Sequence, residues 1–297
     1  MKRVIWVFIF ILSFNSFGDE FECSPKEISP WKEISPGVTF SKFDVAFSPY
    51  LKEKARWSTE KNRSVTVRAL KIDLKQNKLL FHRSEVPIKC DPSSQRYIDL
   101  LMKDSNAEII AAINASFFVM PSGGIQGIAI DEKKIWSNNL INQEKISSGI
   151  LGIKDDSFFL ETKDEFIQKY GPQIDFEEAR EYQFAIQAYP ILLKNNAIKV
   201  DDSVMNQKRS RTSIGLDEND QVILLTIDAR AETAKTGMTL FEYAHFVKKP
   251  ACGVSQKLVL NLDGGGSSAI SVPSEKILEQ ADRCRNLGNI LTVQKRK

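Results

Sequence analysis

Residues 257–268 read KLVLNLDGGGSS and carry the most informative pattern in the chain. An apolar run that favours a β-strand ends on the carboxylate of Asp263, and three glycines and two serines follow it. Glycines allow backbone N–H groups to approach a ligand closely, in the concave geometry that binds anions. The alternative is an ordinary glycine-rich connection after a buried strand. The segment therefore predicts a strand that delivers Asp263 either to a pocket or to a loop.

The bulk composition is that of an ordinary folded protein. The chain has 297 residues, of which 42% are hydrophobic and 27% are charged. This length is ample for a buried core, and the composition does not indicate disorder. The net charge of +3 is small and is not concentrated in one tract. Bulk charge therefore does not point to nucleic acid as a partner, although single arginines can still bind a phosphate.

The first 18 residues are predicted to be a signal peptide. A basic pair precedes an apolar run over residues 4–12, and two small residues, Ser16 and Gly18, precede a cleavage site before Asp19. The run is too short to span a bilayer comfortably, and an uncleaved anchor is the alternative. No later stretch is apolar and long enough to cross a membrane. We therefore predict a periplasmic or secreted protein with no membrane span after cleavage.

The four cysteines lie in the predicted mature chain, and their number is even. In an oxidising compartment this count indicates disulfides, and three pairings are open. We favour Cys23–Cys90 and Cys252–Cys284, which would fasten the N-terminal arm and the C-terminal tail separately. Metal binding is the weaker alternative because no two cysteines are close enough in sequence to form a CxxC half-site.

Two regions follow the signal peptide. Residues 19–62 are rich in proline, serine and charge, and they predict an N-terminal arm of loops and short strands. Residues 63–297 are expected to form one domain. Its first strand begins near Val65, and the apolar alternation changes phase near Ala69, which predicts a β-bulge there.

The rest of the chain predicts many strands and few helices. Turn residues predict hairpins about residues 131–132, 195–196 and 217–220. Short helices are expected over residues 97–103 and 175–182, and a capping box at residues 239–242 opens another helix. The predicted fold class is therefore α+β, with a mixed, largely antiparallel β-sheet core and a few helices.

Three apolar strands end in a polar side chain, namely Asn114, Asp228 and Asp263. If these strand ends converge, they place an amide and two carboxylates on one rim. Paired carboxylates are the usual catalytic groups for cleavage of a glycosidic bond. The alternative is that each polar residue merely bonds to the backbone of its own turn.

Arginines and missing motifs narrow the chemistry further. Arg209, Arg211 and Arg230 flank the hairpin that precedes Asp228, and a guanidinium suits bidentate binding of phosphate or carboxylate. Motifs of zinc hydrolases, serine esterases, P-loop enzymes and dinucleotide-binding enzymes are absent from the sequence. The two histidines lie far apart in the sequence and are predicted to be structural.

The glycine-rich segment and four further motifs resemble one known family. Residues 260–268 look like the signature of the phosphodiester glycosidase domain. Similar motifs follow the family's order at residues 113–118 (INASFF), 189–192 (YPIL), 211–215 (RTSIG) and 237–240 (GMTL). The resemblance covers residues 65–293. The family includes the lysosomal enzyme that removes N-acetylglucosamine from a sugar phosphodiester, and many exported bacterial proteins.

The resemblance implies a glycosidase that hydrolyses a sugar-1-phosphodiester to free sugar and a phosphomonoester. Asp263 is then the nucleophile or base, Asp228 its partner carboxylate or a ligand of a sugar hydroxyl, and Arg211 the phosphate anchor. The other expected substrate-binding residues are Asn114, Thr212, Arg230, Gly264, Gly265, Gly266, Ser267 and Ser268.

The chain departs from the family pattern at several positions. Ala115 and Ser116 replace two glycines, Tyr189 replaces a glycine, and Ala229 stands where a glycine commonly follows the aspartate. Two other functions therefore stay open. One is a non-catalytic module that binds glycan or the cell envelope, and the other is hydrolysis of a surface polysaccharide without phosphate. The sequence establishes no cofactor, although clustered carboxylates could hold calcium, and it leaves the oligomeric state open.

Overall fold

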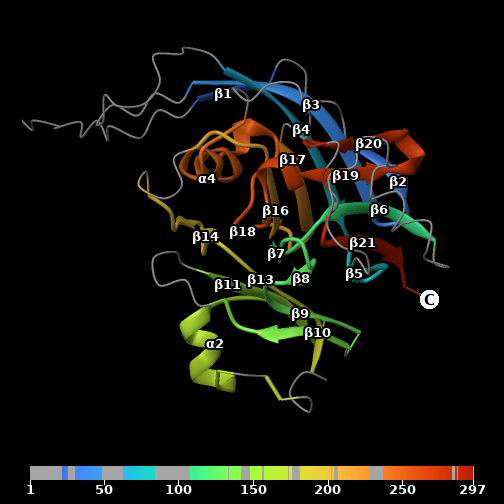
Figure 1. Cartoon of the computed structure of the whole chain (residues 1–297). Coiled ribbons are helices and arrows are strands. Elements are labelled where there is room, and N and C mark those ends of the chain that lie inside the picture. Colours follow the sequence, from blue (N-terminus) through green and yellow to red (C-terminus); the bar gives the residue numbers. More distant parts are fainter. Residues whose placement is uncertain are drawn as a thin grey trace, which may run out of the picture.

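The structure is a computed structural model (Figure 1). It describes residues 22–25, 31–48, 63–83, 108–132, 134–141, 148–155, 157–172, 174–175, 181–201, 203, 207–227, 237–282, 285 and 287–296. The predicted signal peptide and the predicted helix over residues 97–103 lie outside these residues.

The described residues are strongly β-rich, and every strand pairing is antiparallel. They contain two α-helices, so the helical share is smaller than the predicted α+β class implies, whereas the antiparallel sheet core is as expected. Three larger sheets and one two-stranded hairpin make up the fold.

The large sheet has nine strands in the order β1-β3-β4-β17-β16-β18-β14-β15, with β2 paired to β3. Its strands are β1 (Glu22–Pro25), β2 (Lys32–Ser35), β3 (Val38–Ser48), β4 (Arg63–Ile72), β14 (Ile191–Lys194), β15 (Ala197–Ile198), β16 (Arg211–Leu216), β17 (Val222–Ile227) and β18 (Leu258–Asn261). The described strands of the predicted N-terminal arm thus belong to the same sheet as the domain.

Two five-stranded sheets and a hairpin complete the β-structure. The second sheet has the order β10-β9-β13-β11-β12, and the third sheet has the order β20-β19-β6-β21-β5. Their strands are β9 (Gly127–Asp131), β10 (Lys134–Asn139), β11 (Gly149–Lys154), β12 (Ser157–Thr162), β13 (Tyr182–Ala188), β5 (Asn77–Arg83), β6 (Ile109–Asn114), β19 (Ala269–Val272), β20 (Ile277–Gln280) and β21 (Asn289–Lys295). The hairpin pairs β7 (Phe118–Val119) with β8 (Gly124–Ile125).

The two α-helices begin at capping boxes. Thr162 caps α2 (Lys163–Tyr170), and Thr239 caps α4 (Leu240–Lys248), as the sequence predicts for the second of them. The helix expected over residues 175–182 is corrected at its end, because Tyr182 begins β13 instead. Every residue of β13 except Gln183 is buried, so the segment is a core strand and not a charged surface helix. Residues 176–180 lie outside the described residues. Three short 3₁₀ helices are η1 (Pro250–Cys252), η2 (Gly265–Ser267) and η3 (Pro273–Glu275).

All three predicted hairpins are confirmed. β9 pairs with β10, β14 with β15, and β16 with β17. The predicted bulge near Ala69 is wrong, since β4 pairs with β3 and with β17 in an unbroken register. The apolar phase changes there because both faces of β4 are buried. Ala69 faces the helix side of the sheet, and Leu70 faces the other side.

Two hydrophobic cores cover the two faces of the large sheet. On one face, α4 packs against strands β4, β17 and β18 through side chains that include Tyr243, Leu225 and Val259. On the other face, a core that includes Leu70, Phe81 and Phe184 joins the large sheet to both five-stranded sheets. The large sheet is therefore a central layer between a helix and two smaller sheets (Figure 1).

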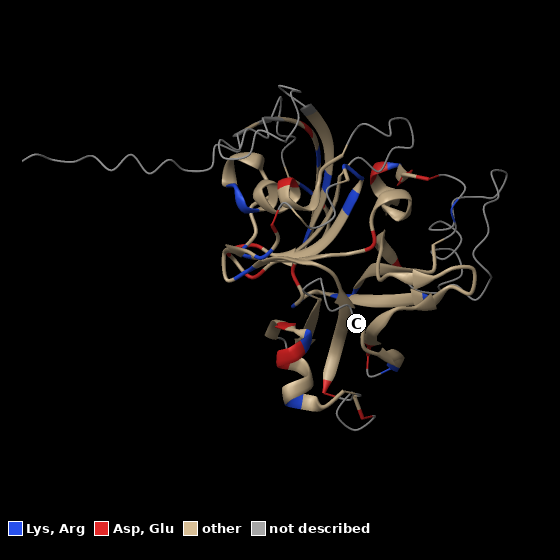
Figure 2. Ribbon diagram, turned by 60° about the vertical axis from the view of Figure 1, so that its left-hand side comes forward, with Lys and Arg blue, Asp and Glu red and all other residues tan. Residues whose placement is uncertain are grey.

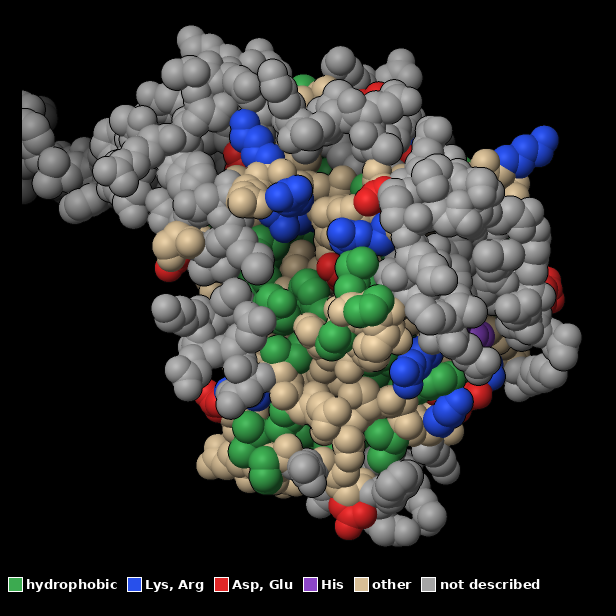
Figure 3. Space-filling model, viewed as in Figure 1, with side chains coloured by type: hydrophobic (Ala, Val, Ile, Leu, Met, Phe, Trp, Pro, Cys, Tyr) green, Lys and Arg blue, Asp and Glu red, His purple; other side chains and the backbone are tan. Residues whose placement is uncertain are grey.

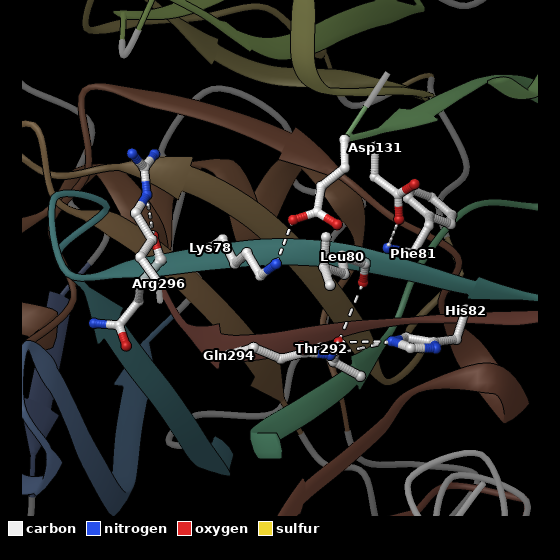
Figure 4. A network of polar contacts seen from close by, with 10 residues as sticks. Lys78, Leu80, Phe81, His82, Asp131, Thr292, Gln294 and Arg296 are labelled. Atoms are coloured by element: carbon white, nitrogen blue, oxygen red, sulfur yellow. Dashed lines mark hydrogen bonds and ion pairs between the residues drawn. The ribbon is translucent and has the colours of Figure 1, made fainter. Parts of the chain in front are cut away.

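A buried carboxylate joins the second and third sheets (Figure 4). Asp131, at the end of β9, accepts hydrogen bonds from the Phe81 N–H of β5 at 2.5 Å and from the Trp136 indole at 2.7 Å. Burial raises the pKa of Asp131, and these two donors oppose the rise. Beside it, Lys78 of β5 forms an ion pair with Glu132, the residue that follows β9. Over the described part of the ribbon, acidic and basic residues are intermixed (Figure 2).

One disulfide, Cys23–Cys252, fastens β1 to η1 with a Cα–Cα distance of 5.2 Å. The favoured pairings Cys23–Cys90 and Cys252–Cys284 are therefore wrong. Sequence separation could not reveal this pairing, because β1 reaches the end of α4 only through its place beside β3 in the large sheet. Cys90 and Cys284 lie outside the described residues. Among the described helices, none has the length and apolarity needed to span a membrane.

The disulfide gives a first prediction about stability. It closes a loop with a sequence separation of 229, so its removal releases a large unfolded-state entropy. We expect Cys23→Ser/Cys252→Ser to lower the free energy of unfolding by about 3–5 kcal/mol in urea titrations without reductant. In reductant, the wild type and the variant should unfold alike. Equal stability without reductant would contradict the pairing.

Candidate active site

The candidate site lies where strand ends from two sheets meet. β17 and β18 are both antiparallel to β16, so their C-terminal ends lie on the edge where β16 begins. β6 of the third sheet ends at Asn114, and a hydrogen bond from the Asn114 Nδ2 to the Asp263 carbonyl, at 2.6 Å, joins it to the segment that follows β18. The structure thus brings together two of the three predicted strand ends. Asp228 and Arg230, which follow β17, lie outside the described residues.

The side-chain amide of Asn114 is buried, and both its nitrogen and its oxygen form hydrogen bonds. Its oxygen accepts from the N–H of Ala269 at 2.9 Å and lies 2.9 Å from the hydroxyl of Thr212. Thr212 also lies 3.1 Å from the hydroxyl of Ser268. These polar atoms are shielded from water, so each bond counts towards holding the strands together.

The glycines after Asp263 form a tight turn against the segment that leads into β16. The N–H of Gly265 donates to the carbonyl of Ser210 at 2.8 Å, and a Cβ on Gly264 would lie 3.0 Å from that same carbonyl. Gly265 has a φ of 59°, in the left-handed region that favours glycine. Gly264, Gly265 and Gly266 are partly exposed, so the turn presents some backbone to solvent, although Asp282 and Arg285 lie over Gly266.

Asp263 is partly exposed as a residue, but its carboxyl is largely enclosed by protein atoms beside this turn. Burial raises the pKa of Asp263 to about 6, although the Ser267 hydroxyl, the positive charge of Arg285 and the Gly264 N–H all oppose the rise. A carboxyl with this pKa exchanges its proton near neutral pH, as catalytic carboxyls do. The position of Asp263 thus combines partial access with an environment that changes its acidity.

Two guanidinium groups flank the glycine turn. Arg209 is exposed, and its Cδ lies 3.9 Å from the place that a Cβ on Gly265 would occupy. On the other side, the Cζ of Arg285 lies 3.4 Å from the corresponding place on Gly266, and its Nη1 lies 3.4 Å from the Ser267 hydroxyl. The side chain of Arg285 is 36% exposed. Both guanidinium groups have partners: Arg209 donates to the Oε1 of Gln207, and the Arg285 Nε lies 4.0 Å from the Asp282 carboxylate. Their exposed donors, beside a partly exposed turn, suit a phosphate group.

Arg211, the phosphate anchor predicted from the sequence, has other partners. Its Nε donates to the carbonyl of Met238 at 2.8 Å, and its Nη2 donates to that of Gln207 at 2.6 Å. Because side chains alternate along β16, Arg211 and Ser213 share one face and Thr212 has the other. Ser213 lies 2.6 Å from the hydroxyl of Tyr243 on α4, so Arg211 is on the helix side and Thr212 faces Asn114.

Arg211 is buried, and its burial, aided by the charge of Arg209, lowers its pKa to about 10. Its guanidinium stays charged at neutral pH. Through the carbonyls of Gln207 and Met238 it holds the segment before β16 against the segment before α4. This geometry is that of a positioning group for the segment that carries Arg209.

Three other expected substrate-binding residues are buried beneath the turn. Thr212, Ser267 and Ser268 are fully buried, so they support the turn from its protein side. Ala115 and Ser116, the two departures after Asn114, are also buried. Their side chains therefore do not project into the solvent-facing part of the site, where they would obstruct a ligand.

Sequence reasoning missed Arg285 and Asn289. Asn289 holds the backbone of Ser116 by accepting from its N–H at 2.7 Å and donating to its carbonyl at 3.2 Å. Both residues lie in the C-terminal segment, where no motif of the sequence singles them out. The hydrogen bond from Asp282 N–H to the Gly266 carbonyl, at 3.1 Å, brings this segment to the glycine turn. Only the tertiary contact could identify them.

The histidines lie away from this junction. His82 bonds to Thr292 in the third sheet at 2.9 Å, and burial lowers its pKa (Figure 4). His245 packs its ring edge against Phe241 within α4. In the described part of the chain, no three His, Cys, Asp or Glu side chains are grouped so that they could hold a metal ion.

Comparisons with known proteins agree with the motifs. A family model described as phosphodiester glycosidase matches residues 107–294. No curated protein matches the chain. Among solved structures, the catalytic domain of zebrafish N-acetylglucosamine-1-phosphodiester alpha-N-acetylglucosaminidase, auto-inhibited by its pro-peptide, has a TM-score of 0.62 at 19% identity, covering 93% of this chain and 88% of that chain.

Two bacterial structures are also similar. A hypothetical protein from Synechocystis has a TM-score of 0.56 at 12% identity, covering 94% of this chain and 68% of its own. A protein from Burkholderia pseudomallei K96243, described as exported, has a TM-score of 0.58 at 10% identity, covering 92% and 97%. At these identities the three structures show a shared fold.

The raised pKa of Asp263 predicts a pH-dependent gain in stability on its removal. At pH 8 the carboxylate is ionised in both states, and burial makes that form costly only in the folded protein. Asp263→Asn should therefore raise the free energy of unfolding by about 1–2 kcal/mol at pH 8, and by much less at pH 4.

Urea titrations at the two pH values measure this difference. The exposed Asp155→Asn is the matched control and should change little at either pH. A loss of stability at pH 8 with Asp263→Asn would mean that the carboxylate is favoured, and not disfavoured, by its surroundings.

Proposed function

Since the chain belongs to the phosphodiester glycosidase family, we propose that it is an exported enzyme that hydrolyses a sugar-1-phosphodiester to free sugar and a phosphomonoester. One observation carries the proposal. Asp263 is a partly exposed residue whose enclosed carboxyl has its pKa raised to about 6, and it lies beside a glycine turn flanked by two accessible arginines. This combination offers a reactive carboxylate and an anion-binding surface side by side. The zebrafish enzyme's name leads us to propose an N-acetylglucosamine-like sugar.

The phosphate is assigned to the surface between Arg209 and Arg285. These cations can neutralise the charge that develops on the departing phosphate oxygen as the bond to the sugar breaks. A phosphomonoester is already a good leaving group, so the demand for a strong general acid is lower than in an ordinary glycoside. Binding and charge stabilisation therefore carry more of the catalysis here than proton donation does.

Asp263 is assigned as the nucleophile or base, acting in its ionised form. The bond between the anomeric carbon and the phosphate oxygen breaks, and its electron pair leaves with the phosphate. The hydroxyl of water ends on the sugar, and its proton is released to the base. Asp228 is proposed as the partner carboxylate or as a ligand of a sugar hydroxyl, and Arg230 as a further substrate-binding residue.

The remaining predicted residues are assigned supporting roles. Asn114 and Thr212 hold the backbone that carries Asp263, because the amide of Asn114 bonds directly to the Asp263 carbonyl. Arg211 positions the segment that leads to Arg209 through two backbone carbonyls. Export rests on the predicted signal peptide, and the disulfide Cys23–Cys252 fits an oxidising compartment.

Turnover of a defined substrate tests the proposal. The mature protein should release free sugar from a methyl phosphodiester of N-acetylglucosamine-1-phosphate, and Asp263→Asn should lower kcat by about 10³-fold. The exposed Asp220→Asn, at a turn between β16 and β17, should retain full activity. Binding of the substrate by the wild type without any release of sugar would instead identify a non-catalytic module. Full activity of Asp263→Asn would overturn its assigned role.

The pH profile tests the link between Asp263 and Arg285. Because the reactive form is the carboxylate, kcat/KM should fall as the pH drops below about 6. The charge of Arg285 lowers the pKa of Asp263, so Arg285→Gln should move this acidic limb to higher pH. Arg285→Lys keeps the charge and should leave the limb near its wild-type position. A limb that moves to lower pH in Arg285→Gln would contradict the arrangement.

A further inference from the structure

A buried side-chain amide supports the turn that carries Arg285. Gln280 is the last residue of β20 and is 3% exposed. Its Nε2 donates to the carbonyl of Asp282 at 2.8 Å, and it also donates to the carbonyl of Arg285. A primary amide nitrogen has two N–H donors. This one nitrogen therefore holds both ends of the turn from Asp282 to Arg285.

Backbone hydrogen bonds attach the same segment to the glycine turn. The Ala281 N–H donates to the Ser268 carbonyl at 2.9 Å, and the Asp282 N–H donates to the Gly266 carbonyl at 3.1 Å. The Arg285 N–H donates to the Asp282 carbonyl at 3.2 Å and so closes the turn. Figure 3 shows basic and acidic side chains close together at the surface over the region of β18 and β19. The guanidinium of Arg285 is thus carried back to the partly exposed glycine turn.

The guanidinium of Arg285 makes long contacts with the described residues. Its Nη1 lies 3.4 Å from the Ser267 hydroxyl, and its Nε lies 4.0 Å from the Asp282 carboxylate. Contacts of this length on an accessible side chain contribute little to holding it in place. The position of the guanidinium therefore depends on the backbone of its turn, which Gln280 holds.

Buried charge fixes the strand from which Gln280 extends. β20 lies at the edge of the third sheet, where it pairs with β19. Glu279 of this strand forms an ion pair with the fully buried Arg68 of β4 and another with Lys42 of β3, at 3.2 Å. Successive side chains of a strand point to opposite faces. Glu279 therefore anchors β20 to the large sheet, while Gln280 is directed at the turn.

The position of Arg285 matters twice in the candidate site. Its charge lowers the pKa of Asp263, against the rise that burial causes. Its guanidinium is also one of the two groups that we assign to the phosphate. A displacement of the turn would therefore change the acidity of Asp263 and weaken the binding of a phosphate together.

We propose that Gln280 is a positioning residue, which holds the guanidinium of Arg285 at the glycine turn for the phosphate of the substrate. The inference rests on the proposed function, because that function assigns Arg285 to the phosphate. Gln280 acts through the backbone carbonyls of Asp282 and Arg285. It is thus a support for the binding group and not a binding group itself.

Titration of the Asp263 carboxyl by ¹³C NMR tests the inference. Gln280→Met keeps a side chain of similar length and shape but removes both donors. The midpoint of Asp263 should then rise above about pH 6 by roughly 0.5, in the direction expected for Arg285→Gln. In Gln280→Met/Arg285→Gln the midpoint should equal that of Arg285→Gln alone, since both substitutions act through one charge. An unchanged midpoint in Gln280→Met, or a further rise in the double variant, would overturn the inference.

Gln294→Met is the matched control. Gln294 is a buried glutamine of β21 in the same sheet, and its Nε2 donates to the Thr292 hydroxyl at 3.1 Å (Figure 4). This variant should also lose stability, because it removes a buried hydrogen bond, but it should leave the Asp263 midpoint unchanged. An equal rise in both variants would show that general loosening moves the midpoint, and it would contradict a special role for Gln280.

A shorter amide keeps the test available if Gln280→Met does not fold. Gln280→Asn retains a polar side chain but withdraws its nitrogen by one methylene, so it cannot reach both carbonyls. The Asp263 midpoint should again rise, and an unchanged midpoint would count against the proposal in the same way.

Binding and turnover separate this inference from the proposed function. In the Asp263→Asn background, Gln280→Met should weaken the binding of methyl phosphate by up to about fivefold in calorimetry, as Arg285→Gln should. If no sugar phosphodiester is hydrolysed but the midpoint and the binding both change, the role of Gln280 stands and the hydrolase proposal fails. If sugar is released but Gln280→Met changes neither quantity, the hydrolase proposal stands and the role of Gln280 is overturned.

Discussion

The buried amide of Asn114 connects strands of two sheets by hydrogen bonds, and the candidate site depends on these bonds. Its oxygen takes the N–H of Ala269 and lies at the hydroxyl of Thr212, while its nitrogen holds the carbonyl of Asp263. No apolar side chain of similar size could satisfy these groups, and each would then be buried without a partner. The strand end of β6 thus sets where the backbone of Asp263 lies, and the glycine turn follows from there.

A costly carboxyl is the consequence of this arrangement. The turn leaves Asp263 partly buried, which raises its pKa, and Ser267, Gly264 and Arg285 compensate only in part. Such a group destabilises the fold when it is ionised, yet the same surroundings make it reactive near neutral pH. The glycines add the second element, because the proposed phosphate site lies at their partly exposed backbone, with Arg209 on one side and Arg285 on the other. The same surroundings of Asp263 therefore lower the stability of the fold and favour the proposed chemistry.

Patterns that are local in sequence predicted much of this structure. The hairpins, the capping box before α4, and the polar ends of β6 and β18 all follow from turn chemistry and apolar periodicity. Features that depend on the tertiary structure could not be predicted from the sequence. The bulge predicted at Ala69 was wrong because both faces of β4 are buried. Such a strand shows no regular alternation of apolar and polar residues. The disulfide between Cys23 and Cys252 and the contact of Arg285 with Gly266 both depend on how the sheets pack.

The fold gives the carboxyl of Asp263 a raised pKa beside a partly exposed turn, and the proposed chemistry depends on it. The most direct test is a titration of its side-chain carboxyl by ¹³C NMR in the folded wild-type protein, with Asp263→Asn used to assign the resonance. We expect a midpoint at about pH 6. A midpoint near 4, the ordinary value for an aspartate, would contradict it.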